Sequence, residues 1–108
     1  MRMMNKNVSV SNNISVSVSR DIKALLPDVL IEYLWKLVLC RDLQNREQQT
    51  FVLKTGELGG QRIQDIRHVC DNGNLIDTRR VYGVEPVNCS LQVYPSQEGY
   101  RMKLCAGF

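Results

Sequence analysis

His68 and Cys70 are the residues of this sequence that come closest to a nucleophile with its base. Residues two apart on a β-strand project from the same face, so the imidazole could deprotonate the thiol. The sequence shows no third residue that would orient the imidazole, and a single histidine in a polar strand is more often a solvated side chain. Catalysis by His68 and Cys70 therefore ranks last among our hypotheses, and we expect no enzyme.

The cysteines and glycines do not form a metal site or a phosphate site. The cysteines are Cys40, Cys70, Cys89 and Cys105, and the glycines that cluster in one segment are Gly56, Gly59 and Gly60. No two cysteines form a C-x-x-C pair, and a single histidine cannot complete a zinc site. The glycines precede no Lys-Ser or Lys-Thr, so they are expected to act as loop hinges. We therefore expect free thiols, no metal and no cofactor.

Basic charge is concentrated in the middle of the chain, at Arg62, Arg67, Arg79 and Arg80. If neighbouring strands bring these arginines together, the patch could bind phosphates or an acidic protein surface. Acidic residues are interleaved with them, so a solvated surface of mixed charge is the alternative. The net charge of +3 is smaller than a dedicated nucleic-acid binder usually carries. Nucleic-acid binding through this patch is our second hypothesis.

The elements that position these residues can be read from the hydrophobic pattern. Aliphatic residues alternate with Ser or Asn from Val8 to Val18, which predicts one half-buried strand or two strands joined at Asn12 and Asn13. Apolar residues then recur at intervals of three and four from Ile22 to Val38, which predicts a helix. Because proline cannot donate a hydrogen bond, either a short turn spans Asp21 to Leu26 and the main helix begins with Pro27 in its first turn, or a longer helix is kinked there; we prefer the first. The pattern becomes polar near 41–45, where the helix is expected to end.

The second half of the chain is predicted to be extended. The expected strands are 49–54, 61–70, 75–82, 87–93 and 100–104, the last two forming a hairpin. In segment 61–70 the apolar residues Ile63, Ile66 and Val69 are three apart, which would suit a helical turn. The flanking glycines favour a strand instead. The predicted fold is α+β, with one main helix packed on a largely antiparallel sheet of five to six strands.

Length and composition indicate an ordinary folded protein. A chain of 108 residues with 44% hydrophobic residues suits a single domain spanning 1–108, with residues 1–7 flexible. The N-terminal segment lacks the apolar stretch of a secretory signal, and no apolar run is long enough to span a bilayer. We therefore expect a cytoplasmic protein with no membrane contact.

The predicted helix has more apolar surface than one sheet can cover. Nine of the eleven residues from Val29 to Leu39 are apolar or aromatic. If one stripe of the helix faces the sheet, Ile31, Trp35 and Leu39 lie on the flank toward solvent, where an exposed tryptophan is typical of an interface. We expect this flank to bind a protein partner or a second copy of the chain. The alternative is that a strand or loop of the same chain covers it.

Several segments resemble a family of small proteins of unknown function from Firmicutes, their phages and plasmids. The likeness runs over about 14–105 and is carried by 32–38, 49–53, 60–68 and 85–88 together with the closing hairpin. It implies a bacterial or mobile-element origin. Small accessory proteins from such sources are commonly non-enzymatic binders, including inhibitors of host defence of the anti-CRISPR type. Our leading hypothesis is therefore a small protein-interaction module that binds a protein or nucleoprotein target.

Overall fold

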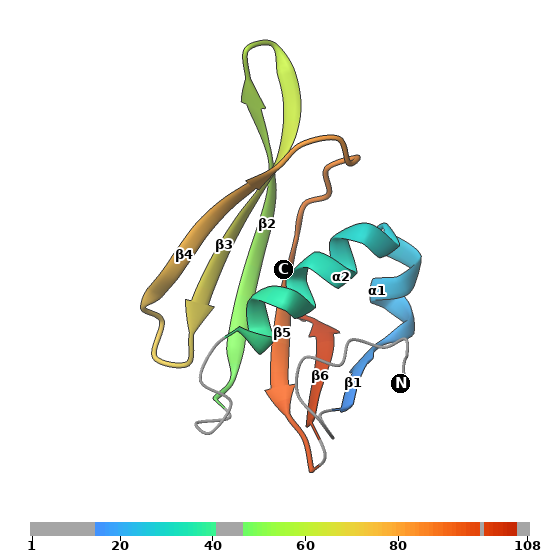
Figure 1. The fold of residues 1–108 in the computed structure, drawn as a ribbon, viewed down its shortest axis with the longest axis vertical. Coiled ribbons are helices and arrows are strands. Elements are labelled where there is room, and N and C mark those ends of the chain that lie inside the picture. Colours follow the sequence, from blue (N-terminus) through green and yellow to red (C-terminus); the bar gives the residue numbers. More distant parts are fainter. Residues whose placement is uncertain (1–14, 41–46, 98, 106–108) are drawn as a thin grey trace.

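A computed structural model of the chain describes residues 15–40, 47–97 and 99–105. Two helices and six strands follow one another as β1 Ser15–Val18, α1 Arg20–Leu25, α2 Asp28–Leu39, β2 Gln49–Leu58, β3 Gln61–Cys70, β4 Leu75–Val81, β5 Cys89–Pro95 and β6 Gly99–Leu104 (Figure 1). The fold is α+β, as the sequence predicts. The expected flexibility of residues 1–7, the strand pattern before Ser15 and the expected helix end at 41–45 lie outside the described residues.

The six strands form a single sheet in the order β1-β6-β5-β2-β3-β4. All neighbours are antiparallel except β1, which runs parallel to β6. The longest hairpin, β2–β3, extends beyond the rest of the sheet (Figure 1). Its turn consists of Gly59 and Gly60 at φ 60° and 80°, a backbone region that glycine enters without steric cost. The predicted sheet of five to six largely antiparallel strands is therefore confirmed, and 61–70 is a strand.

Strand β2 is longer than the predicted 49–54, because Gly56 lies within it instead of ending it. Gly56 is opposite Ile63 on β3, and a Cβ at this position would overlap the carboxylate of Asp65. The glycine therefore gives Asp65 room over the surface of the sheet. Its role is to allow close packing between neighbouring strands rather than to form a turn.

The expectation of one main helix is not confirmed, because two short helices, α1 and α2, are present. Leu26, between them, has an extended backbone at ψ 142°, the conformation that a following proline imposes on its neighbour. Pro27 is the residue immediately before α2, whose first turn does not require its missing N–H. The helical spacing across Ile22 to Val38 is therefore interrupted by one extended residue and a proline.

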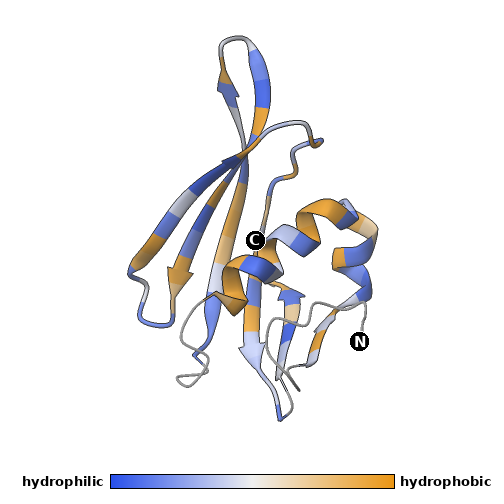
Figure 2. Cartoon of the chain, viewed as in Figure 1, coloured by the Kyte–Doolittle hydropathy of each residue, from blue (hydrophilic) through white to orange (hydrophobic). Residues whose placement is uncertain are grey.

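Both helices pack on one face of the sheet. Helix α2 crosses in front of the sheet with α1 beside it, and hydrophobic residues line the helix and the strands behind it (Figures 1 and 2). The centre of the core contains Leu30 and Leu34 from α2 against Phe51, Leu91 and Met102 from the sheet, all at most 1% exposed. This contact removes a large apolar area from water, which is the main driving force for the fold.

The expectation that Ile31, Trp35 and Leu39 face solvent is wrong. Their exposed fractions are 8%, 5% and 5%, and all three belong to the main core cluster. A sheet of six strands is about 24 Å wide at roughly 4.8 Å per strand spacing, wider than the roughly 10 Å diameter of a helix. One helix therefore leaves much of the width of the sheet free for other side chains, and those on the flank of α2 belong to the same core cluster as those on its facing stripe.

The strand register divides the side chains of the sheet between two faces, because directly opposite residues project to the same side. The covered face, which meets the helices, includes Phe51 with its neighbours His68 and Leu91. The outer face, which points away from the helices, includes Val52 with its neighbours Arg67 and Ser90.

Candidate functional site

His68 is a core residue of the covered face and not a solvated side chain, so that expectation is wrong. It is 2% exposed, and its ring stacks on Phe51 with centroids 4.3 Å apart. Its Nε2 lies 2.6 Å from Oε1 of Gln49, which is also buried. Stacking and a buried hydrogen bond hold the imidazole in one orientation, which is the role of a structural histidine.

Cys70 does not pair with His68. Its thiol donates to Oδ1 of Asn72, 2.8 Å away, in the turn between β3 and β4. The same oxygen accepts the backbone N–H of Asn74 at 3.1 Å. The two residues proposed as nucleophile and base therefore have different partners, and the enzyme hypothesis gains no support from their geometry.

Burial weakens the acidity of two other thiols. Desolvation raises the pKa of Cys89 to about 11, with a smaller contribution from the neighbouring Cys105. Burial also raises the pKa of Cys105. Because the thiolate is the reactive form of cysteine, neither thiol resembles an activated nucleophile near neutral pH.

The four arginines proposed as one patch are divided between the two faces. Arg62 and Arg79 share the covered-face side, where Arg62 pairs with Glu85 at 3.1 Å and Arg79 pairs with Asp77 at 2.7 Å. Arg67 and Arg80 lie on the outer face. Arg79 and Arg80 are adjacent on a strand, so they must project in opposite directions. The predicted single patch is therefore wrong.

The outer face has a basic surface that the sequence hypothesis missed in part. Five exposed cations project from it, one or two on each of four strands: Lys54, Arg67, Arg80, Arg101 and Lys103. Among the described strand residues of this face, Asp65 is the only carboxylate, and it lies 3.6 Å from Arg80. Five cations against one carboxylate exceed the net charge of +3 of the whole chain. Among the residues that the structure describes, the excess of positive charge is therefore concentrated on this face.

The cations surround a floor of uncharged side chains. Thr50 and Val52 of β2 and Ser90 and Gln92 of β5 are half-buried there, between the basic residues of β6 and those of β3 and β4. Neither helix of the described part of the chain covers this floor. An extended polyanion could therefore lie across the strands and contact cations at both ends of the floor.

One aromatic residue adjoins the basic residues of β6. Tyr94 is half-buried on the outer face, directly opposite Arg101. The ammonium of Lys103 lies 5.4 Å from the centre of its ring, and Arg101 donates to the hydroxyl of Ser17 at 3.2 Å. The phenol of Tyr94 also donates to Gln92. These contacts orient the two cations above the sheet, which lowers the entropy cost of binding a ligand.

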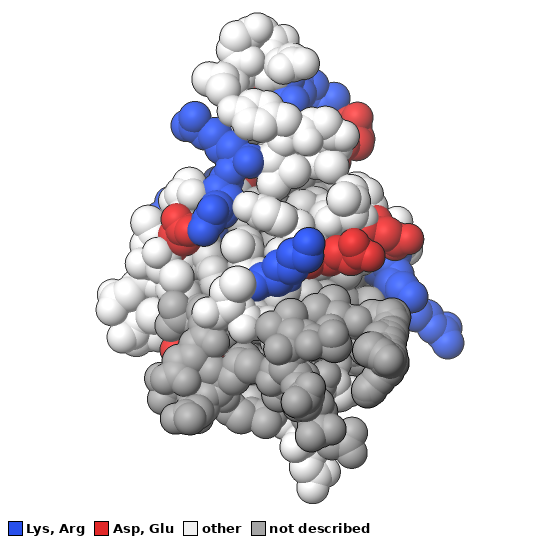
Figure 3. Space-filling view, viewed as in Figure 1, with Lys and Arg blue, Asp and Glu red and all other residues white. Residues whose placement is uncertain are grey.

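The helix side of the molecule has a different charge pattern. Figure 3 shows that, in the described part of this side, basic and acidic side chains lie next to one another. The exposed pairs of Arg62 with Glu85 and Arg79 with Asp77 follow the same pattern. Neighbouring opposite charges cancel each other's field at a distance, so the described part of this side attracts polyanions weakly.

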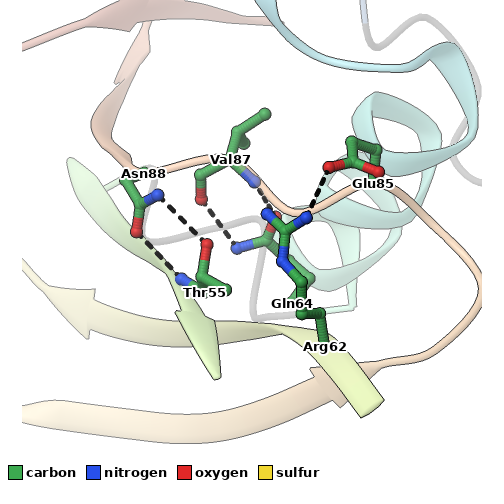
Figure 4. Close-up of polar contacts among 6 residues, drawn as sticks. All are labelled: Thr55, Arg62, Gln64, Glu85, Val87 and Asn88. Atoms are coloured by element: carbon green, nitrogen blue, oxygen red, sulfur yellow. Dashed lines mark hydrogen bonds and ion pairs between the residues drawn. The ribbon is translucent and has the colours of Figure 1, made fainter. Parts of the chain in front are cut away.

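The loop after β4 is attached to the long hairpin by amide side chains (Figure 4). The Gln64 amide accepts the backbone N–H of Val87 at 2.7 Å and donates to its carbonyl at 3.0 Å. The Asn88 amide accepts the N–H of Thr55 at 2.9 Å and donates to its hydroxyl at 3.1 Å. The loop is thus fixed on the covered-face side, and the outer face stays clear of it.

Within the described ranges, no group of three or more His, Cys, Asp or Glu residues is placed to hold a metal ion. Over the same ranges, no helix is long and apolar enough to cross a membrane.

A scan against models of known families, a search of curated proteins and a search of solved structures each found no match. The function must therefore be argued from the geometry of the chain itself.

Proposed function

We propose that this protein is a cytoplasmic, non-enzymatic accessory protein that binds single-stranded nucleic acid on the outer face of its sheet. The observation that carries this proposal is the ratio of five exposed cations to one carboxylate on a face that the helices leave clear. Lys and Arg neutralise phosphates and release their counterions, which supplies most of the affinity of sequence-independent binding.

The shape of the surface favours single strands over a duplex. The sheet is roughly 24 Å across, whereas the major groove of B-DNA is about 12 Å wide. Such a sheet cannot enter the groove, but a flexible single strand can follow its surface, as on other sheet platforms. Tyr94 at the border of the floor offers a surface on which a base could stack.

The test is the salt dependence of binding, measured by fluorescence anisotropy with a labelled single-stranded oligonucleotide of mixed sequence. Five phosphate contacts predict a slope of about −3.5 for log K against log salt concentration. Arg67→Glu combined with Lys103→Glu should lower the affinity at low salt by at least about tenfold, because each reversal replaces a phosphate contact with repulsion.

The matched control is Lys23→Glu combined with Lys36→Glu, which changes the net charge equally on exposed residues of the two helices. Circular dichroism should show that both double variants are folded. The control should bind within about threefold of the unmodified protein, because its charges lie on the helix side and contact no phosphate of an oligonucleotide bound on the outer face. An equal loss in both variants, or no complex at low salt, contradicts the proposal.

A protein-binding module is the second candidate, such as an inhibitor of host defence of the kind that the family resemblance implies. It no longer depends on the buried flank of α2, but Leu25 and Val29 on the helices are 42% and 59% exposed. The outer face would also suit an acidic protein surface. Competition decides between the candidates: if polyglutamate displaces the oligonucleotide as well as unlabelled oligonucleotide does, the basic face lacks a preference for nucleic acid and the protein-binding candidate is favoured.

A further inference from the structure

Strand β4 forms one edge of the sheet. It pairs with β3 on one side, and no strand of the described residues pairs with its other side. Alternate residues of such an edge strand direct backbone N–H and C=O groups outward, where they can pair with another strand. The seven residues of β4 are Leu75, Ile76, Asp77, Thr78, Arg79, Arg80 and Val81.

The geometry of the sheet restricts how β4 can pair with itself. Two antiparallel copies are related by a twofold axis perpendicular to the sheet, which keeps each face continuous across the interface. Two residues that lie opposite each other across the interface must then project to the same face, so their numbers differ by an even number. The twofold axis therefore passes through the position of one residue, which lies opposite its own copy, and not between two residues. The centre of a seven-residue strand is Thr78.

Centring on Thr78 matches opposite charges. It places Asp77 of each copy opposite Arg79 of the other and Ile76 opposite Arg80, with the two Thr78 residues side by side on the outer face. Asp77 and Arg79 already lie on the same face, where their side chains form an ion pair at 2.7 Å and are 42% and 48% exposed. Two such pairs would form a ring of alternating charges around the axis. Opposite charges and Thr–Thr pairs across strands both stabilise antiparallel pairing.

The neighbouring registers are unfavourable. Centring on residue 77 places the two Asp77 carboxylates opposite each other, and centring on residue 79 or 80 does the same for two arginines. Like charges directly opposite destabilise a strand pair. Only the register centred on Thr78 uses the middle of the strand without such a clash.

A bulge limits the extent of the contact. Between His68 and Val69 the register of β3 against β4 shifts, and Ile76 is the extra residue on β4. The three central pairs, from Asp77 to Arg79, lie outside the bulge. An interface made of one pair of strands with a few residue pairs is smaller than a standard protein interface. Its formation should therefore depend on protein concentration.

We infer that this protein forms a homodimer by antiparallel pairing of β4 centred on Thr78. The dimer has one continuous sheet of twelve strands, in which the outer faces of the two copies adjoin. This inference is independent of the proposed nucleic-acid binding, because Asp77 and Arg79 lie on the covered-face side and the mass of the protein is measured without nucleic acid.

Charge reversal with sedimentation equilibrium tests the inference. The unmodified protein should show a concentration-dependent dimer, whereas Arg79→Asp and Asp77→Arg should each be monomeric, because each places like charges opposite one another. An equimolar mixture of the two variants should dimerise again, since the heterodimer restores opposite charges in both pairs. The control Arg62→Asp makes the same charge change in an exposed ion pair away from the edge and should remain dimeric.

Restored dimerisation in the mixture identifies an intermolecular contact, because an ion pair within one copy cannot be repaired by mixing. The inference is overturned if the unmodified protein is monomeric over its soluble range. It is also overturned if both reversals remain dimeric or if the mixture stays monomeric. Circular dichroism of each variant confirms that it is folded before its mass is interpreted.

Discussion

The two faces of the sheet solve different physical problems with the same strands. On the covered face, side chains such as Phe51 and Leu91 are withdrawn from water, and the polar ones, Gln64 and His68, have hydrogen-bond partners. On the outer face, Arg67 and Lys103 stay exposed above half-buried neighbours. The comparison teaches that stability resides on one side of this sheet, while the other side is free to carry charge for binding.

The largest loss of stability is expected for a substitution of Trp35, which packs in the core on the covered face of the sheet. Trp35→Ala should lower the free energy of unfolding by about 3–5 kcal/mol, because the truncation leaves a cavity among core residues. Chemical denaturation measures this value. The control is Val29→Ala on the same helix, where the side chain is 59% exposed and the change should be within about 0.5 kcal/mol. Equal effects at the two positions would contradict the burial of the flank of α2.

Strand positions were predictable from sequence because a half-buried strand alternates visibly between apolar and polar residues. Strand order was not, since β4 connects to β5 across two intervening strands and no local signal specifies that path. The burial of Ile31, Trp35 and Leu39 escaped prediction for a related reason. Helical periodicity gives the apolar faces of a helix, but not which of them become buried in the core.

The candidate site was recognised only in part. Alternation along a strand is enough to place Arg79 and Arg80 on opposite faces, so this error was avoidable. Alternation also places Arg101 and Lys103 on the face of their strand that does not carry the apolar residues. What the sequence could not supply is the register that brings these two residues to the same face as Arg67. A surface patch made from separate strands depends on long-range pairing, whereas each strand is a local feature.

A substitution of Gln64 should cause an intermediate loss of stability. Its amide makes two hydrogen bonds with Val87, and the side chain is fully buried. Gln64→Ala should lower the free energy of unfolding by about 1–3 kcal/mol, because it leaves partly buried backbone groups of Val87 without their partners. The amide of Val87 should also exchange its hydrogen faster. Gln92→Ala on the outer face is the control, and a loss there as large as at Gln64 would remove the distinction between the faces.

The smallest effect is expected at the ion pair of Arg80 with Asp65 on the outer face. Their atoms are 3.6 Å apart and the side chains are 57% and 38% exposed, so solvent screens the attraction. A double-mutant cycle with Arg80→Ala and Asp65→Ala should give a coupling energy of at most about 0.5 kcal/mol, which falls further in high salt. A coupling above about 1 kcal/mol would mean that the outer face contributes to folding. If the coupling is small, evolution can change these charges without loss of fold, which is the property that a binding surface requires.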